Sequence, residues 1–251
     1  MLIDVGRVEF RAVEKLRQSF RAGVDCQIVH DSILPRRLAD PYLLTVGGAV
    51  AGYGGVWTKY HPGRVVEFWI DAPFRGHRTE LFRAFLARSG AREMEAQTNI
   101  PAMCEYLHEF GDQPVVEKIL FRDGGATALE CAGSSFRRRR ADDEGPEGEW
   151  VVEIAGDVVA AGGVLTHYNP PYGDLFMEVS PSARGRGAGS YVVQELRRVA
   201  RDRGLVPAAR CDPDNTASWR TLERGGMTPC GRLLAAPIRA EFLPCLATGR
   251  G

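Results

Sequence analysis

A short glycine-rich stretch in the second half of the chain has the residue types that hold a phosphate group. Glycines stand at Gly185, Gly187 and Gly189, and arginines stand among them at Arg184 and Arg186. Without a Cβ atom the backbone can approach a ligand closely and adopt positive φ, so several N–H groups can converge on an anion. Arginine side chains add charge-assisted hydrogen bonds. The stretch therefore predicts a site for a phosphate or pyrophosphate, with a purely structural turn as the alternative.

The residues on either side predict that this stretch joins a strand to a helix. An apolar strand, Leu175–Val179, precedes it, and a helix is expected to begin at about Ser190 and to stop near Gly204. Such a helix would aim the positive end of its dipole at the bound anion. One face of it carries the apolar residues Val192, Val193, Leu196, Val199 and Ala200.

Two common nucleotide motifs do not fit. The dinucleotide fingerprint GxGxxG needs a glycine where the chain has Ser190, and no Lys-Ser/Thr pair follows to make a P-loop. Hairpins are expected before the loop, where a dinucleotide-binding fold has strand-helix-strand crossovers. A dinucleotide-dependent enzyme is therefore the weakest of the functions considered.

A repeat divides the chain into two similar parts. The segment Gly54–Pro62 matches Gly162–Pro170 at a constant offset of 108 residues. Each copy predicts a strand, a glycine-containing turn and two further strands. The expected modules are 1–122 and 123–251, and an amphipathic helix is expected before about residue 23. The predicted strands are Tyr42–Val46, Val50–Lys59 and Val65–Ile70 in the first copy, and Trp150–Ile154, Val158–His167 and Leu175–Val179 in the second.

Two motifs of the second copy resemble those of the GNAT superfamily of N-acetyltransferases. Val179-Ser-Pro181 followed by Arg184–Gly189 is similar to its pyrophosphate motif, and Asn215 stands where the family has an asparagine that closes the fifth strand. The resemblance covers about residues 150–235. It implies an α/β fold with two tandem GNAT-like modules, each a mostly antiparallel mixed sheet flanked by helices, whose fourth and fifth strands splay apart.

The resemblance also implies a cofactor, acetyl-CoA, and the residues that hold it. The backbone around Met177–Val179 would bond the pantetheine arm and the acetyl carbonyl. No metal is expected. The residues expected to bind the cofactor are Met177, Val179, Arg184, Gly185, Arg186, Gly187, Ala188, Gly189, Ser190, Asn215 and Ser218.

The first copy departs from this motif. Its corresponding loop runs from Asp71 to Glu80, and if Arg75 takes the arginine position, Arg78 and Glu80 occupy the two glycine positions. Side chains there would block the backbone, and a carboxylate would repel a phosphate. The sequence predicts a degenerate first module and one cofactor site per chain.

Amide formation needs a group that takes a proton from the attacking amine. The carboxylates of the presumed fourth strand are Asp174 and Glu178, and Glu178 is the expected base because it lies beside the acetyl-binding backbone. The alternative is that its side chain faces away, since a bulge in this strand would change the alternation. Many family members have a tyrosine seven residues after this asparagine that protonates the leaving thiolate, but here that position holds Leu222. Tyr106 in the first half is expected to lie in the core. Cys211 is expected to be a buried side chain that fills space and takes no part in the chemistry.

Composition limits the class of protein. The 251 residues carry 32 Lys+Arg and 32 Asp+Glu, so no bulk charge favours nucleic acid or an acidic membrane. No apolar run is long enough to span a bilayer. The four arginines Arg137–Arg140 are balanced by the acidic stretch Asp142–Glu147, which favours a linker or strand end over a nucleic-acid contact. The scattered cysteines predict free thiols in a cytoplasmic protein. They are Cys26, Cys104, Cys131, Cys211, Cys230 and Cys245.

Two kinds of function fit these residues. The first is an N-acetyltransferase that moves an acetyl group from acetyl-CoA to a primary amine of a small molecule or peptide. The second is a non-catalytic module that binds acyl-CoA, in which the missing tyrosine marks the loss of turnover. The expected partner is the amine, without nucleic acid or membrane, and a homodimer is an open alternative.

Overall fold

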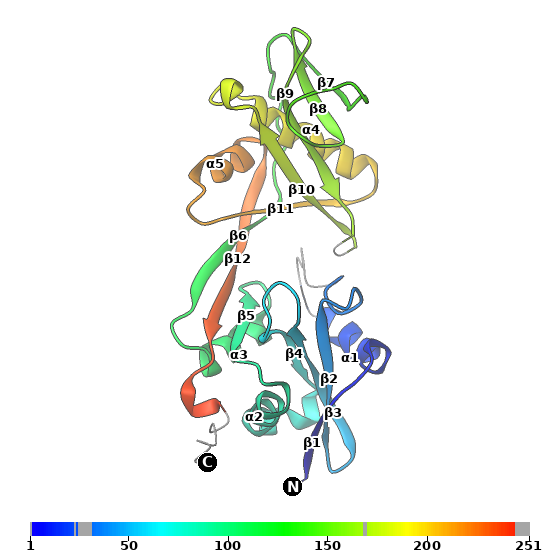
Figure 1. Cartoon of the computed structure of the whole chain (residues 1–251), viewed down its shortest axis with the longest axis vertical. Helices are drawn as coiled ribbons and strands as arrows, with labels where there is room; N and C mark the ends of the chain where they lie inside the picture. Colours follow the sequence, from blue (N-terminus) through cyan, green and yellow to red (C-terminus); the bar gives the residue numbers. More distant parts are fainter. Residues whose placement is uncertain (1, 23, 25–31, 168–169, 244–251) are drawn as a thin grey trace, which may run out of the picture. The chain divides into compact units, whose positions relative to one another are not determined.

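The computed structural model describes residues 2–22, 24, 32–167 and 170–243. These residues fall into two compact units (Figure 1). Residues before 118 together with 233–243 form the first unit, and 118–232 form the second. The expected α/β fold in two modules is therefore confirmed, with one difference at the C-terminus.

That difference concerns the last strand. The expected modules, 1–122 and 123–251, assign the whole C-terminal segment to the second module. In the structure Leu233–Pro237 pairs antiparallel with Glu93–Gln97 and so belongs to the first unit. Strand pairing between segments this far apart in the chain leaves no local signature, so the repeat alone does not predict it.

The first unit is a mixed sheet with helices on both faces. Among the strand pairs of its described residues, β4 and β5 run parallel and the others antiparallel. Its strands, in spatial order, are β1 (Ile3–Arg7), β2 (Ala39–Val46), β3 (Ala49–Trp57), β4 (Arg64–Ile70), β5 (Glu93–Gln97) and the end of β12 (Met227–Pro237). Strand β1 was not expected.

The helices of the first unit bury alternate residues of β4. Helix α1 (Phe10–Ala22), expected from its spacing, covers the face that carries Glu67. Helices α2 (Arg78–Ser89) and α3 (Pro101–Phe110) cover the other face, where the Phe68 ring packs on Phe82, Phe85 and Tyr106. Consecutive strand residues point to opposite faces, which explains how Glu67 and Phe68 serve different helices.

The second unit is also a mixed sheet. In its described part, β10 pairs parallel with β11, and antiparallel pairs flank them. The spatial order is the start of β12, then β6 (Val115–Asp123), β11 (Val206–Cys211), β10 (Tyr172–Val179), β9 (Asp157–Leu165), β8 (Trp150–Ile154) and β7 (Ser134–Arg138).

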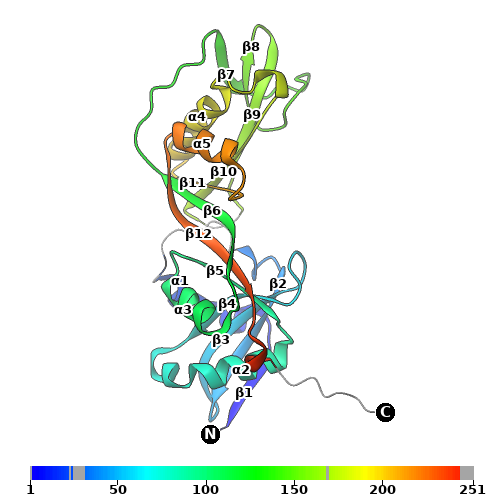
Figure 2. The same ribbon diagram turned by 90° about the vertical axis from the view of Figure 1, so that its left-hand side faces the viewer.

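Two helices lie against one face of this second sheet. Helix α4 (Ala188–Asp202) packs on β9, β10 and β11, and α5 (Thr216–Arg224) packs on α4 and β11, as Figure 2 shows. Helix α4 begins two residues before the expected start and ends near Gly204, as predicted. The apolar face predicted for it is buried: Val192, Val193, Leu196 and Ala200 are at most 1% exposed.

The repeat is present in backbone detail. The turns Gly47–Gly48 and Ala155–Gly156, 108 residues apart, have positive φ at both positions, as in a type I′ hairpin turn. The registers of the two hairpins shift between Leu44 and Thr45 and between Val152 and Glu153, again 108 residues apart. The two copies therefore share the same hairpin with the same irregularity.

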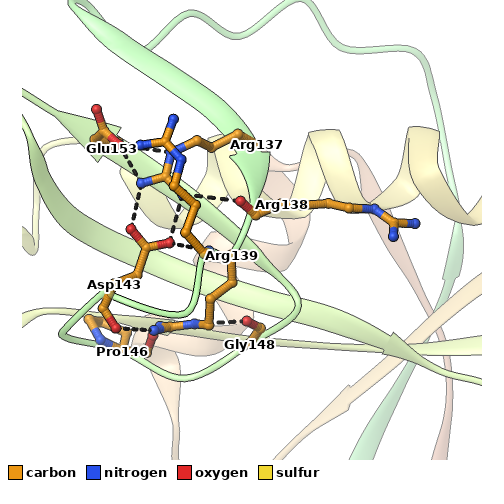
Figure 3. A network of polar contacts seen from close by, with 8 residues as sticks. Arg137, Arg138, Arg139, Asp143, Pro146, Gly148 and Glu153 are labelled. Atoms are coloured by element: carbon orange, nitrogen blue, oxygen red, sulfur yellow. Dashed lines mark hydrogen bonds and ion pairs between the residues drawn. The ribbon is translucent and has the colours of Figure 1, made fainter.

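The arginine run predicted as a linker or strand end does end a strand, β7, and two of its members hold the following loop in place (Figure 3). Arg137 donates to both carboxylate oxygens of Asp143, at 2.6 and 2.7 Å, and to Glu153. Arg139 donates to the carbonyl oxygens of Gly148 and Asp143. These guanidinium groups are thus used inside the second unit.

Three general expectations can be compared with the described residues. No helix among them is both long and apolar enough to cross a bilayer. None of their His, Cys, Asp and Glu side chains form a group that could hold a metal ion. Four cysteines, Cys104, Cys131, Cys211 and Cys230, are free thiols, and the other two lie outside the described residues.

Candidate functional site

A cavity of about 460 Å³ opens in the second unit where β10 ends and α4 begins. It brings together ten of the eleven residues expected to hold the cofactor, and the expected base, Glu178. The lining residues are Met177, Glu178, Val179, Ala183, Arg184, Gly185, Gly187, Ala188, Gly189, Ser190, Asn215, Ala217, Ser218, Arg220, Thr221 and Arg224.

The strands beside the cavity separate, as expected. Strand β10 pairs with β11 only over Tyr172–Asp174, whereas it pairs with β9 as far as Val179. The edge of Leu175–Val179 that faces β11 therefore has no strand partner. Free backbone N–H and C=O groups on such an edge can pair with an extended ligand.

The bend after β10 has the conformation predicted from its glycines. Gly185 and Gly187 have φ of 76° and 89°, and a Cβ atom at either position would meet no protein atom within 4 Å. Glycine is needed there for its backbone conformation and leaves open space in front of it. Gly187 caps α4 without any side-chain hydrogen bond, so the first N–H groups of the helix remain available to an anion.

Gly189 has another role than the one expected. Its φ is not positive, and a Cβ atom there would lie 3.1 Å from the Cγ2 atoms of Val179 and Thr221. This glycine lets the first turn of α4 lie close to α5 and β10. It lines the cavity, but the structure needs it for packing between elements.

The arginines of the site are distributed differently from the prediction. Arg184 lines the cavity and its Nε atom donates to the carbonyl oxygen of Val179 at 3.3 Å. Arg186 is exposed and is not among the lining residues. Arg220 and Arg224, one turn apart on α5, line the cavity and were missed. Because they are four residues apart, they lie on the same face of the helix, and this spacing is the feature of the sequence that could have predicted their shared position.

Asn215 and Ser218 stand at the start of α5. The Asn215 Oδ1 atom accepts a hydrogen bond from the Ser218 backbone N–H at 2.9 Å, which caps the helix. Both residues line the cavity. The cap explains why an asparagine precedes this helix even without a ligand.

The side chains of β10 alternate without a bulge between Asp174 and Val179. Met177 and Val179 pack against the core beneath α4, whereas Phe176 and Glu178 are exposed. Glu178 lines the cavity at the end of the strand. Because the register is unbroken, successive side chains point to opposite faces of the sheet, and Glu178 lies on the same face as Phe176.

Proton donors other than tyrosine line the cavity. Leu222, at the position of the expected tyrosine, is buried in the core. The hydroxyl groups among the lining residues are those of Ser190, Ser218 and Thr221. Tyr106 of the first unit is core, as expected, and burial raises its pKa to about 12.

Two further titratable groups lie near the gap between the strands. Burial raises the pKa of the Cys211 thiol, in agreement with its expected role as a filler. Asp174 is 5% exposed, and burial raises its pKa to about 6, although Arg210 acts in the opposite direction. The Arg210 Nη2 atom lies 3.7 Å from Asp174 Oδ2.

The loop of the first unit lacks this architecture. A short 3₁₀ helix, Ala72–His77, takes the place of the glycine bend, and Gly76 does not have positive φ. Glu80 stands in the first turn of α2, where a bound phosphate would lie. These features agree with a degenerate first module.

Comparisons with known proteins fit this description. Residues 116–227 match the family model described as the acetyltransferase (GNAT) family. A GNAT-family acetyltransferase from Colwellia psychrerythraea has a TM-score of 0.75 over 95% of this chain and 100% of its own, at 16% identity. A tandem GNAT protein from the clavulanic acid biosynthesis pathway, solved without AcCoA, has a TM-score of 0.57 at 14% identity, over 94% of this chain and 98% of its own. At these identities the likeness shows the fold alone, and no curated protein matches the chain.

Proposed function

Because the chain carries an acetyltransferase domain of the GNAT family over residues 116–227, we propose that it transfers an acetyl group from acetyl-CoA to a primary amine of a small molecule or peptide. The observation that carries the proposal is the cavity in which the glycine bend meets the unpaired edge of β10. This combination offers a cradle for a pyrophosphate and a partner for an extended amide-containing arm. A pyrophosphate and an extended amide-containing arm are both parts of coenzyme A.

The charge of the cavity supports the same cofactor. Its lining residues include three arginines, Arg184, Arg220 and Arg224, and one carboxylate, Glu178. Guanidinium groups bind phosphate oxygens in bidentate fashion. Two arginines on α5, in addition to the pyrophosphate loop, suit a ligand with a third phosphate such as the 3′-phosphate of coenzyme A.

The residues of the site would do three things in the reaction. Bound acetyl-CoA supplies the acetyl group as a thioester. The backbone edge of β10 would orient the arm, and a carboxylate on β10 would take a proton from the amine. The hydroxyls of Ser218 and Thr221, which line the same cavity, would be available to protonate the leaving thiolate. Glu178, the base expected from the sequence, lines the cavity.

A non-catalytic acyl-CoA-binding module is the second candidate. It is favoured by one observation, the buried Leu222 where the family has a tyrosine acid. Thiol release from acetyl-CoA, measured with a panel of primary amines, separates the two functions. Amine-dependent release supports the enzyme; tight binding of coenzyme A in calorimetry with no release on any amine would support the binding module.

The same proposal includes one cofactor per chain and a cytoplasmic setting. Glu80 and the 3₁₀ helix of the first unit stand against a second phosphate site. The free thiols of the described part suit a reducing compartment. Calorimetric titration with coenzyme A should give a stoichiometry near one, and a value near two would overturn the assignment of the first module.

A further inference from the structure

Strand β10 carries a row of three side chains on the face opposite α4 and α5: Asp174, Phe176 and Glu178. The core beneath α4 contains Leu175, Met177 and Val179, so alternation places the even-numbered residues on the other face. The helices of this unit in the described part of the chain, α4 and α5, share one face. The side chains of the row therefore point away from the core beneath α4, although Glu178, at the end of the strand, also lines the cofactor cavity.

Asp174 is the unusual member of the row because it is buried without a complete set of partners. Its side chain is 7% exposed, and its Oδ1 atom has no hydrogen-bond partner among the described residues. Its Oδ2 atom faces Arg210 at 3.7 Å, beyond hydrogen-bond distance. Leaving a buried acceptor unpaired costs stability, so such a group in a folded protein needs an explanation, of which a catalytic role is one.

The position of Asp174 in the sheet gives this oxygen a use. Asp174 and Ala208 form the last rung between β10 and β11, so Asp174 stands at the inner end of the gap. From Val179 to Asp174 the strand runs for five residues, or about 16 Å, which is comparable with an extended pantetheine arm. An arm that starts at the glycine bend and follows the unpaired edge would bring its thioester towards Asp174. Glu178, by contrast, stands near the outer end.

Phe176 lies between the two carboxylates and is 40% exposed. Its ring covers Gly163 of β9, where a Cβ atom would lie only 2.8 Å from the ring. Glycine at this position thus lets the ring lie flat on the sheet. An exposed aromatic ring beside carboxylates is a surface that attracts an alkylammonium group.

We propose that the acceptor approaches from this face, that its ammonium group binds at Asp174 beside Phe176, and that Asp174, rather than Glu178, takes its proton. The proposal rests on the proposed acetyltransferase function. Glu178 then serves to attract the cationic acceptor to the row. Asp174 becomes the catalytic residue and Phe176 a residue that favours aliphatic amines.

The proton and electron balance is simple. One proton of the ammonium group passes to the Asp174 carboxylate, which frees the nitrogen lone pair. The nitrogen forms a C–N bond with the thioester carbonyl carbon, and the C–S bond breaks with its electron pair on sulfur. A second proton leaves the new amide nitrogen and neutralises the thiolate, so the products are the amide, the free thiol and a protonated Asp174 that returns its proton to water.

The surroundings of Asp174 suit a base. Burial raises its pKa to about 6, closer to that of an alkylamine than an ordinary carboxyl, yet low enough for ionisation at neutral pH. Arg210 on β11 favours the ionised form. The other titratable groups that alternation places on this face include Tyr172 and Glu178 on β10, Lys118 and Arg122 on β6, and Cys230 and Arg232 on β12.

The test compares Asp174→Asn and Glu178→Gln with Asp202→Asn, a control at the exposed end of α4. With a reactive amine, Asp174→Asn should lower kcat/KM at least about 100-fold, the usual contribution of a general base, while coenzyme A affinity changes less than twofold. The wild-type rate should rise with pH through about 6, and this limb should be absent in Asp174→Asn. Arg210→Met should move the limb to higher pH, because it removes the cation that favours ionisation.

A readout independent of turnover completes the experiment. The ¹³C carboxyl resonance of Asp174, assigned by its absence in Asp174→Asn, should titrate near pH 6 in the free protein and at lower pH with the amine bound. If the wild type turns over but Asp174→Asn keeps its rate and its pH limb, or if the amine leaves the resonance unchanged, Asp174 is not the base. If the wild type neither binds acetyl-CoA nor releases thiol, the proposed function itself fails.

Discussion

The Nη1 atom of Arg197, in the middle of α4, donates a hydrogen bond of 2.7 Å to the carbonyl oxygen of Gly225 at the end of α5. The same side chain is 1% exposed and also bonds Asp123 and the carbonyl of Gly125. At Gly226, with φ of 92°, a Cβ atom would lie 1.8 Å from this Nη1 atom. One buried guanidinium group therefore joins the two helices that line the cofactor cavity.

Replacing Arg197 by Met should lower the free energy of unfolding by about 3 kcal/mol, because the carbonyls of Gly225 and Gly125 lose their buried donor. Asp123 keeps its bonds to Arg201, which limits the loss. Arg198→Ala is the matched control, since that side chain is 51% exposed and forms a surface ion pair with Glu195. It should cost less than about 1 kcal/mol. Urea denaturation measures both, and equal losses would contradict the role given to Arg197.

Gly187→Glu should reduce affinity for coenzyme A at least about 100-fold, the equivalent of losing two charge-assisted hydrogen bonds. The substitution places a side chain and a negative charge at the glycine bend. Gly204→Glu is its control, because Gly204 also has positive φ, 72°, and open space around a Cβ atom, but lies at the other end of α4. Both variants should lose similar stability from the strained backbone. Calorimetry should show weakened binding in the Gly187 variant alone, and equal affinities would refute the assigned loop.

The glycine bend and the repeated hairpins could be predicted because local residue types determine them. Positive φ at Gly185 and Gly187 follows from glycine at a strand-to-helix bend, and the hairpin turn at Gly47–Gly48 recurs at Ala155–Gly156. The separation of β10 and β11 followed from a family resemblance carried by two motifs. Each of these features depends on a few neighbouring residues.

The features that were missed depend on contacts between distant segments. Gly189 is needed because Thr221 of α5 packs against it, and Arg220 and Arg224 reach the cavity only through the packing of α5 on α4. The burial of Asp174 likewise depends on neighbouring strands. Residue type and spacing do not encode such distances, so the sequence favours Glu178 for its place beside the acetyl-binding backbone and gives no sign that Asp174 is buried.

Arg17→Met should destabilise the first unit by about 3–5 kcal/mol, the usual loss when one partner of a buried ion pair is removed. The Arg17 guanidinium bonds both carboxylate oxygens of Glu67 at 2.8 Å, and the Tyr53 hydroxyl donates to the same carboxylate. Glu67 is fully buried and would keep an uncompensated charge. The double variant Arg17→Met/Glu67→Gln should recover part of the loss in thermal denaturation. Exposed Arg11 on the same helix is the control, and a loss from Arg11→Ala as large as that from Arg17→Met would contradict the assignment.

Asp174→Asn should make the protein more stable at pH 8 and leave its stability unchanged below about pH 4. The pKa of Asp174 rises from an ordinary 3.8 to about 6 in the folded protein, chiefly through burial, so the folded state holds its proton more tightly than the unfolded chain. Stability is therefore highest below the unfolded pKa and falls as pH rises towards 6, by about 3 kcal/mol in all. Asparagine carries no charge and removes this dependence, and Arg210 offsets little because its side chain is 28% exposed and keeps contact with water. Urea denaturation at pH 4 and pH 8 measures the difference between variant and wild type. A variant that is less stable than the wild type at pH 8 would show that the carboxylate stabilises the fold, which is the opposite of a group kept for its chemistry.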